Sequence, residues 1–241
     1  HHPRHAHHHR ADSNSSEHHR ARRMKLALEL SQREATIAVG HHEKVATRPV
    51  SMGGRQEHDV LWPMIEEATH EVGGKPSDLC EVVVNIGPGG FTGVRTAVAT
   101  AAMLGRLGSQ VLALPAHLAV AEASLEDGGD KASIVLAVKK HRAWIGTVHW
   151  QDGRWTTFGS AQDVEIESFF AQHKPDRVVA DAHLPEEFQG GCEIIPLRTS
   201  ARALLKRLEK DASRTSLEEL RPIYPRVPEA VRLWEERRPG L

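Results

Sequence analysis

The stretch from Glu81 to Leu104 constrains this chain more than any other, because an apolar strand, a glycine-rich turn and an apolar helix follow one another. The run from Val82 to Ile86 predicts a buried strand, and residues Phe91 to Leu107 predict a long helix. The turn between them contains Pro88 and several glycines, whose backbone can take positive φ or approach another segment closely. These glycines are Gly87, Gly89, Gly90 and Gly93.

The predicted helix is apolar on more than one face. Its charges are confined to Arg95 and Arg106, near its two ends. A surface helix normally has one apolar stripe, so this helix must be covered on more than one side. Two hypotheses remain open: the helix is buried within its own domain, or a partner protein covers its second face. One face holds Val94, Val98, Ala101 and Gly105, and the other holds Ala97, Thr100, Leu104 and Leu107.

The turn is not a standard phosphate-binding motif. A P-loop requires Lys and a hydroxyl residue after its last glycine, whereas Gly93 is followed by Val94 and Arg95. The spacing from Gly87 is also one residue too long, and the glycines do not form G-x-G-x-x-G. The turn can still offer amides to an anion at a helix N-terminus. We do not expect a catalytic site there.

Length and composition predict a globular protein of one or two domains with a proper core. No apolar run reaches the roughly 20 residues that span a bilayer, so we expect no membrane segment. Cys80 and Cys192 are far apart and belong to no zinc or redox motif, which indicates free thiols in a reducing compartment. We therefore expect a cytoplasmic protein.

Residues 1–23 are predicted to be a disordered, His-rich leader, because they lack apolar periodicity. Their eight histidines can bind nickel or zinc without biological meaning, and we expect no native metal site. This leader carries a net charge of +3, which leaves about −4 on the body of the chain. A mildly acidic body is a poor candidate for binding nucleic acid on its own, because Lys and Arg supply most of that affinity.

From Met24 the pattern predicts two consecutive α/β halves, residues 24–127 and 132–241, separated by the polar, glycine-rich stretch Glu126 to Lys131. Each half begins with three antiparallel strands and continues with alternating helices and strands. In the first half these are strands from Met24, at 35–39, 44–50 and 110–114, with helices at 55–68 and 115–124. In the second they are strands at 133–138, 143–150, 154–158, 177–180 and 192–195, with helices at 164–173 and 200–210 and an extended, proline-rich tail.

Three segments carry a resemblance to a known family. The run Gly87-Pro-Gly-Gly-Phe-Thr-Gly-Val-Arg95 resembles the signature G-P-G-S-F-T-G-[LV]-R of the TsaB (YeaZ) family. His58 followed by Leu61-Trp-Pro-Met-Ile65 resembles the H-x-x-x-L-x-P-M-I helix of that family, and Ile223 to Ala230 resembles its C-terminal tail. The resemblance covers essentially all of residues 24–241.

The resemblance implies an α/β, actin-like (ASKHA, ribonuclease H-like) fold of two tandem lobes. It implies a non-catalytic paralogue of the TsaD (Kae1) subunit, within the complex that transfers a threonylcarbamoyl group to the adenosine next to the tRNA anticodon. Such a subunit docks the TsaD-type catalytic subunit, works with the TsaE-type ATPase and forms a homodimer when alone. It has no catalytic residues and no cofactor of its own, since ATP belongs to its partners, and it meets tRNA only through the complex.

The resemblance also implies that the signature region is a pairing surface, which agrees with the apolar helix found from the sequence pattern. We therefore predict a partner interface and a signature turn in this region. The predicted interface residues are Phe91, Val94, Arg95, Val98, Ala101, Ala102, Leu61 and Ile65, and the turn residues are Gly87, Pro88, Gly89, Gly90, Thr92 and Gly93.

The chain departs from the family at three places. The phosphate loop I-D-T-S of the family is replaced by Leu28-Glu29-Leu30-Ser31, and its D-A-R segment by Val138-Lys-Lys-His-Arg142. Gly90 stands where the family has Ser. The first two changes argue against the alternative function, an ATP-dependent transferase or ATPase that acts on its own. A third candidate, a glycoprotease, requires a metal-spaced pair of histidines on a helix, and the sequence has none.

Overall fold

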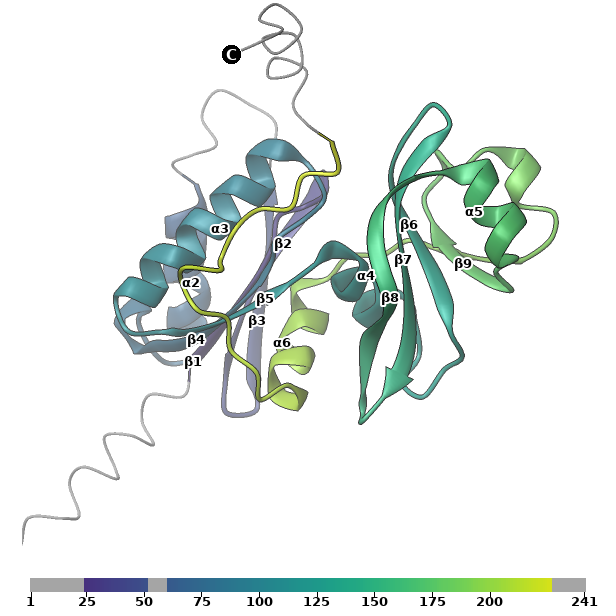
Figure 1. Cartoon of the computed structure of the whole chain (residues 1–241). Coiled ribbons are helices and arrows are strands. Elements are labelled where there is room, and N and C mark those ends of the chain that lie inside the picture. The colour runs from purple at the N-terminus through teal and green to yellow at the C-terminus, as the bar shows by residue number, and fades with distance from the viewer. Residues whose placement is uncertain (1–23, 52–59, 227–241) are drawn as a thin grey trace, which may run out of the picture.

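The computed structural model describes residues 24–51 and 60–226. The predicted leader, the first residues of the helix expected from residue 55, and the last part of the tail lie outside these ranges. The described chain forms two five-stranded mixed sheets with helices on both faces of each (Figure 1). The expected α/β fold of two lobes is therefore confirmed. The predicted second half, residues 132–241, does not form the second lobe alone, because residues 201–210 pack on the first sheet.

The first sheet has the strand order β3-β2-β1-β4-β5. Its first three strands form an antiparallel meander, and β4 and β5 then join β1 in parallel. His42 takes a φ of 54° in the tight turn between β2 and β3. The strands are β1 (Met24–Glu29), β2 (Glu34–His41), β3 (Lys44–Ser51), β4 (Leu79–Asn85) and β5 (Gln110–Leu114).

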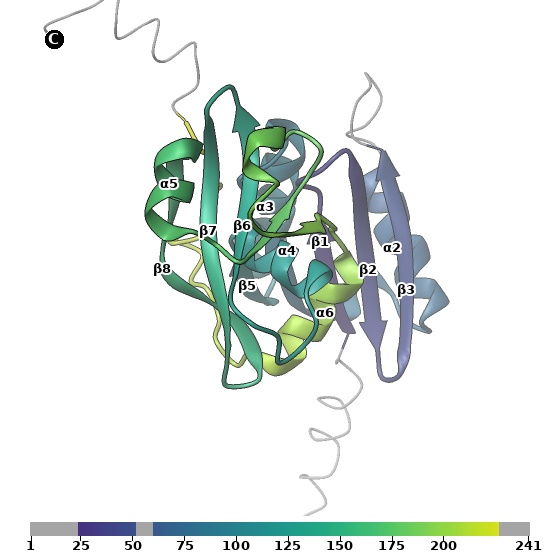
Figure 2. The ribbon, with the colours of Figure 1, turned by 90° about the vertical axis from the view of Figure 1, so that its right-hand side faces the viewer.

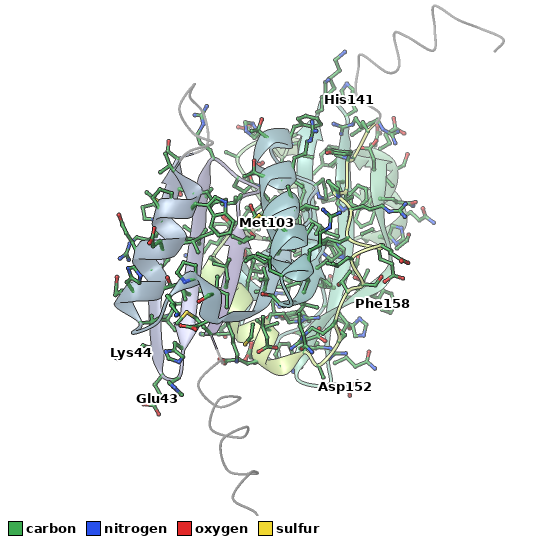
Figure 3. All side chains as sticks on the ribbon, turned by 90° about the vertical axis from the view of Figure 1, so that its left-hand side faces the viewer. Glu43, Lys44, Met103, His141, Asp152 and Phe158 are labelled. Carbon is green, nitrogen blue, oxygen red and sulfur yellow. The ribbon has the colours of Figure 1, made fainter. Side chains whose placement is uncertain are left out.

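Two helices, α2 (Leu61–Glu71) and α3 (Phe91–Arg106), cover the outer face of this sheet (Figure 3). Pro63 lies in the first turn of α2, where a missing N–H leaves no helical hydrogen bond unmade. Gly73, with a φ of +89°, follows the end of α2. The buried side of α2 repeats at helical spacing, as the sequence predicted, through Leu61, Ile65 and Ala68.

The second sheet has the order β10-β9-β6-β7-β8, again with three antiparallel strands followed by parallel ones. Its strands are β6 (Ala132–Lys139), β7 (Arg142–Gln151), β8 (Arg154–Glu165), β9 (Arg177–Ala180) and β10 (Glu193–Pro196). The helix α5 (Ile166–His173) packs beside β8 on the outer face. Strand β8 is longer than predicted, because after an irregularity near Gly159 it pairs with β7 again as far as Glu165.

The helices α4 (Ala116–Ser124) and α6 (Ala201–Lys210) lie between the two sheets (Figures 1 and 2). Although α6 follows the strands of the second sheet, it packs on β1 and β2 of the first. Ser200 caps its N-terminus by accepting a hydrogen bond of 3.3 Å from the amide of Ala203. The layers are therefore α2 and α3, the first sheet, α4 and α6, the second sheet, and α5. No helix in residues 24–51 and 60–226 is long and apolar enough to cross a membrane.

Candidate functional site

The signature turn is a junction at which three other segments of the chain meet. The amide of Gly90 donates to the carbonyl of Ser31 (2.7 Å), and the amide of Ala116 at the start of α4 donates to the carbonyl of Gly87 (2.7 Å). The amide of Ile223, in the C-terminal tail, donates to the carbonyl of the residue before the turn (2.7 Å). The turn thus holds together the loop after β1, the start of α4 and the tail.

Two signature glycines are required by this close packing. A Cβ on Gly89 would lie 2.4 Å from the carbonyl oxygen of Ser31. A Cβ on Gly87, which has a φ of +95°, would lie 2.7 Å from the carbonyl oxygen of Ile223. A Cβ on Gly90 would meet nothing closer than 3.5 Å, so the serine of the family pattern would fit there. The turn is therefore shaped by its packing against the chain itself.

The carboxylate of Glu29, at the position of the degenerate phosphate loop, is completely buried. It accepts hydrogen bonds from the hydroxyl (2.5 Å) and amide (3.1 Å) of Ser31 and from the side-chain amide of Asn85 (2.8 Å). Burial raises the pKa of Glu29, and the hydrogen bonds from Ser31 and Asn85 oppose that rise. Both carboxylate oxygens are thus engaged by the protein interior.

The corresponding hairpin of the second lobe, between β6 and β7, is cationic. Lys140 and His141 are exposed at its tip (Figure 3). Arg142 donates from Nε to a carboxylate oxygen of Asp163 (2.7 Å), on the neighbouring strand β8. Positive charge therefore stands where the family pattern places an aspartate. In the described part of the chain, no group of three or more His, Cys, Asp or Glu side chains is arranged to hold a metal ion.

The predicted interface residues fall into two groups. Five of them are buried in the core of the first lobe, at 0–7% exposure, and cannot contact a partner from there: Leu61, Ile65, Val94, Val98 and Ala101. The side of α3 that carries Val94, Val98 and Ala101 lies against the first sheet, so we correct the predicted interface there. Ala102 is half-buried, while Phe91 and Arg95 are exposed.

A different side of α3 faces outward. Along it, Phe91, Arg95, Ala99 and Met103 follow one another at intervals of four residues and are all exposed. Trp62 on α2, the other helix that covers the outer face of the first sheet, is 37% exposed. We call these five residues the outer helical face (Figure 3). Phe91 and Met103 are 52% and 39% exposed, which is high for large apolar side chains.

The N-terminal end of this face is joined to the C-terminal tail. The rings of Phe91 and Tyr224 are 5.3 Å apart, and the guanidinium of Arg95 lies 5.0 Å from the centre of the Phe91 ring. Four residues here were not predicted as surface candidates from the sequence: Ala99, Met103, Trp62 and Tyr224. The four-residue spacing along α3 was the available signal, but a helix apolar nearly all round does not reveal which side meets the sheet.

Comparisons with known proteins agree with this architecture. Residues 51–145, less than half of the chain, match the family model of TsaD, described as tRNA N6-adenosine threonylcarbamoyltransferase. YeaZ from Pseudomonas aeruginosa superposes with a TM-score of 0.65 at 20% identity, covering 83% of this chain and 99% of that one. The chain has a YeaZ-like fold. It has the predicted actin-like, two-lobed fold.

A second crystal structure, of an uncharacterized protein with similarity to peptidase YEAZ from Pseudomonas aeruginosa, superposes with a TM-score of 0.68 at 21% identity. The match covers 84% of this chain and 99% of the other. No curated protein matched the chain. The part of the chain that matches the TsaD model includes both helices of the outer helical face.

Proposed function

We propose that this protein is a non-catalytic scaffold subunit of a tRNA threonylcarbamoyl-transfer complex, and that it docks a TsaD-type catalytic subunit through the outer helical face. In this proposal the chain forms a homodimer through the same face when alone. The TsaE-type ATPase supplies the nucleotide chemistry, and tRNA is met only through the assembled complex. The setting of the complex is the cytoplasm.

The observation that carries the proposal is the exposed apolar surface on α3 and α2. Phe91 and Met103 on α3 and Trp62 on α2 are exposed on the two helices that cover the first sheet, and α3 directly follows the signature turn. Exposed apolar surface of this kind marks a protein–protein contact more often than a small-molecule site. Arg95, between Phe91 and Ala99 along α3, adds a cation to the same surface.

The alternative, an actin-like ATPase or ATP-dependent transferase acting alone, is less well supported. Such an enzyme needs carboxylates that face the cleft and bind the magnesium nucleotide. Glu29 is instead turned into the interior and hydrogen-bonded there, and Ser31 is packed against the signature turn. The hairpin of the other lobe offers Lys139 and Lys140 in place of a carboxylate.

The proposal is tested with Ala99→Arg, which places a long cation in the middle of the outer helical face. Its matched control is Ala171→Arg, at an exposed position of α5 on the other lobe. Both should remain folded by circular dichroism. Each variant is run on size-exclusion chromatography with light scattering, first alone and then mixed with the TsaD-type subunit of the same organism. The control should form the homodimer when alone and the complex with that subunit when mixed. Ala99→Arg should form neither.

Three results would contradict the proposal or part of it. Unchanged binding of the TsaD-type subunit by Ala99→Arg would place the docking surface elsewhere. Failure of the wild-type chain to form a complex with that subunit would refute the scaffold role. Calorimetric binding of magnesium ATP to the isolated wild-type chain, with turnover, would favour the enzymatic alternative.

A further inference from the structure

The layer of helices between the two sheets belongs to both lobes at once. On α4, Ala119 packs in the core beneath the first sheet, whereas Ala116 and Val120 pack in the core of the second. The helix α6 packs on the first sheet and against α4. Lobes that open and close normally turn about a few hinge residues. Here the layer of α4 and α6 between the lobes, which we call the floor, is instead an apolar layer shared by both lobes. Such a layer opposes movement of one lobe relative to the other.

A buried ionic cluster ties this floor to the second sheet. Arg207 of α6 donates to the carboxylate of Glu122 on α4 (2.7 Å), to Asp211 (3.0 Å) and to the main-chain carbonyl of Trp155 on β8 (2.5 Å). The side chains of the three charged residues are only 3–5% exposed. Arg154 of β8 also lies 3.3 Å from Asp211. We call this cluster the floor clasp.

The tail that follows α6 forms a second connection at the opposite end of the lobes. Thr215 bonds the edge of β5 through its main chain (2.7 Å), and Ile223 bonds the strand end before the signature turn (2.7 Å). Arg226 then reaches the second lobe, with its guanidinium 3.1 Å from the carbonyl oxygen of Ala137 and 2.8 Å from the carboxylate of Asp163. Figure 1 shows this yellow segment running over the first lobe beside α3 and ending at the top, on the side that faces the second lobe. We call the Arg226 contacts the rim clasp.

We propose that the floor clasp and the rim clasp together fix the angle between the lobes, so that this protein is a rigid body without the hinge motion of actin-like enzymes. Rotation of one sheet against the other about the α4 and α6 layer must pull Arg207 away from a buried carboxylate or from the Trp155 carbonyl. Separating charges in a low-dielectric interior is costly. The rim clasp is weaker because its side chains are 29% and 14% exposed, and it limits rotation at the end far from the floor clasp.

The consequence is that the cationic hairpin at residues 139–142 keeps one position relative to the outer helical face. The distance between the lobes does not change when nucleotide is added. This inference is independent of the proposed scaffold function, because it concerns only contacts within the chain.

Spin labels on the full chain test it. Lys44→Cys, in the hairpin of the first lobe, and Asp152→Cys, in a turn of the second, give two exposed label sites (Figure 3). Cys80→Ser and Cys192→Ser remove the native thiols. Double electron–electron resonance should give a single narrow distance population, unchanged by magnesium ATP. Two populations, or a shift on adding magnesium ATP, would overturn the inference.

The variant Arg207→Met with Arg226→Gln removes both clasps and should add a second, broader population. If that double variant does not fold, Arg207→Lys with Arg226→Gln is measured in its place, and the same second population is expected. The matched control is Arg177→Gln, which breaks an ion pair with Glu193 inside the second lobe and should leave the narrow population intact. A folded variant without clasps that keeps the same narrow population as this control would refute the role of the clasps.

Discussion

Replacing Arg207 with methionine should be among the most destabilising single changes available in the described chain. The substitution keeps a long side chain but removes every charge contact of the guanidinium. Glu122 then loses its only partner among the described residues, while the Trp155 carbonyl loses its 2.5 Å donor. Asp211 keeps its ion pair with Arg154 and its hydrogen bond from Ser213, so the change destabilises this carboxylate less.

The magnitude follows from burial. The side chains of Arg207 and Glu122 are 4% and 3% exposed, so the remaining carboxylate stays out of water. Removing one partner of a buried ion pair costs about 3–5 kcal/mol. For a chain of this size each kcal/mol lowers the Tm by about 2–4 °C, which gives a decrease of roughly 10 °C.

Urea denaturation followed by circular dichroism measures this loss. The control Arg177→Met removes an ion pair whose side chains are 24% and 61% exposed, and it should cost at most about 1 kcal/mol. Adding Glu122→Leu to Arg207→Met should recover part of the stability, because no unpaired carboxylate remains at that point. Equal losses for Arg207→Met and the control would refute the reasoning.

Three further predictions concern the signature turn, a buried histidine and α3. Gly89→Ala should cost about 1–3 kcal/mol in urea denaturation, because its Cβ meets a main-chain oxygen at 2.4 Å, whereas Gly90→Ser should be nearly neutral; equal costs would contradict this. Burial lowers the pKa of His117 to about 4, so between pH 6.5 and 4 the unfolded chain binds a proton that the folded chain does not. The free energy of unfolding should therefore fall by about 3 kcal/mol as the pH falls through this window, and His117→Gln should remove that part of the slope. Val98→Arg should unfold the first lobe and Ala99→Arg should not, as judged by circular dichroism, because the first side chain is 7% exposed and the second faces solvent.

Much of the fold was predictable because its signals are local. Apolar alternation and turn residues located β1 to β7 closely, and the helices α3 and α4 begin within one residue of the prediction. Strand β8 was predicted too short, since its last residues are polar and are held by pairing with β7 rather than by their own pattern. The start of α5 was displaced for the same reason.

At the candidate site, local sequence patterns predicted some features and could not predict the tertiary contacts. The sequence predicted that α3 has too much apolar surface for one covering layer, and that the glycines of the turn allow a close approach. Which chain segments approach the turn was decided by tertiary contacts, since Ser31 and Ile223 are far from Gly89 in the sequence. Tertiary contacts also decided the position of Val98. It was predicted to contact a partner, but its side of α3 packs on the first sheet.

The sequence of this chain was enough to establish its tandem α/β architecture, its signature turn and its resemblance to the YeaZ family, because each depends on residues close together along the chain. Only the tertiary structure decided that α6 returns to the first lobe, that Glu29 is turned inward and that Arg207 and Arg226 join the lobes. These features depend on contacts between residues up to 184 positions apart. Such contacts form only when folding brings distant apolar surfaces together, and no local periodicity records them.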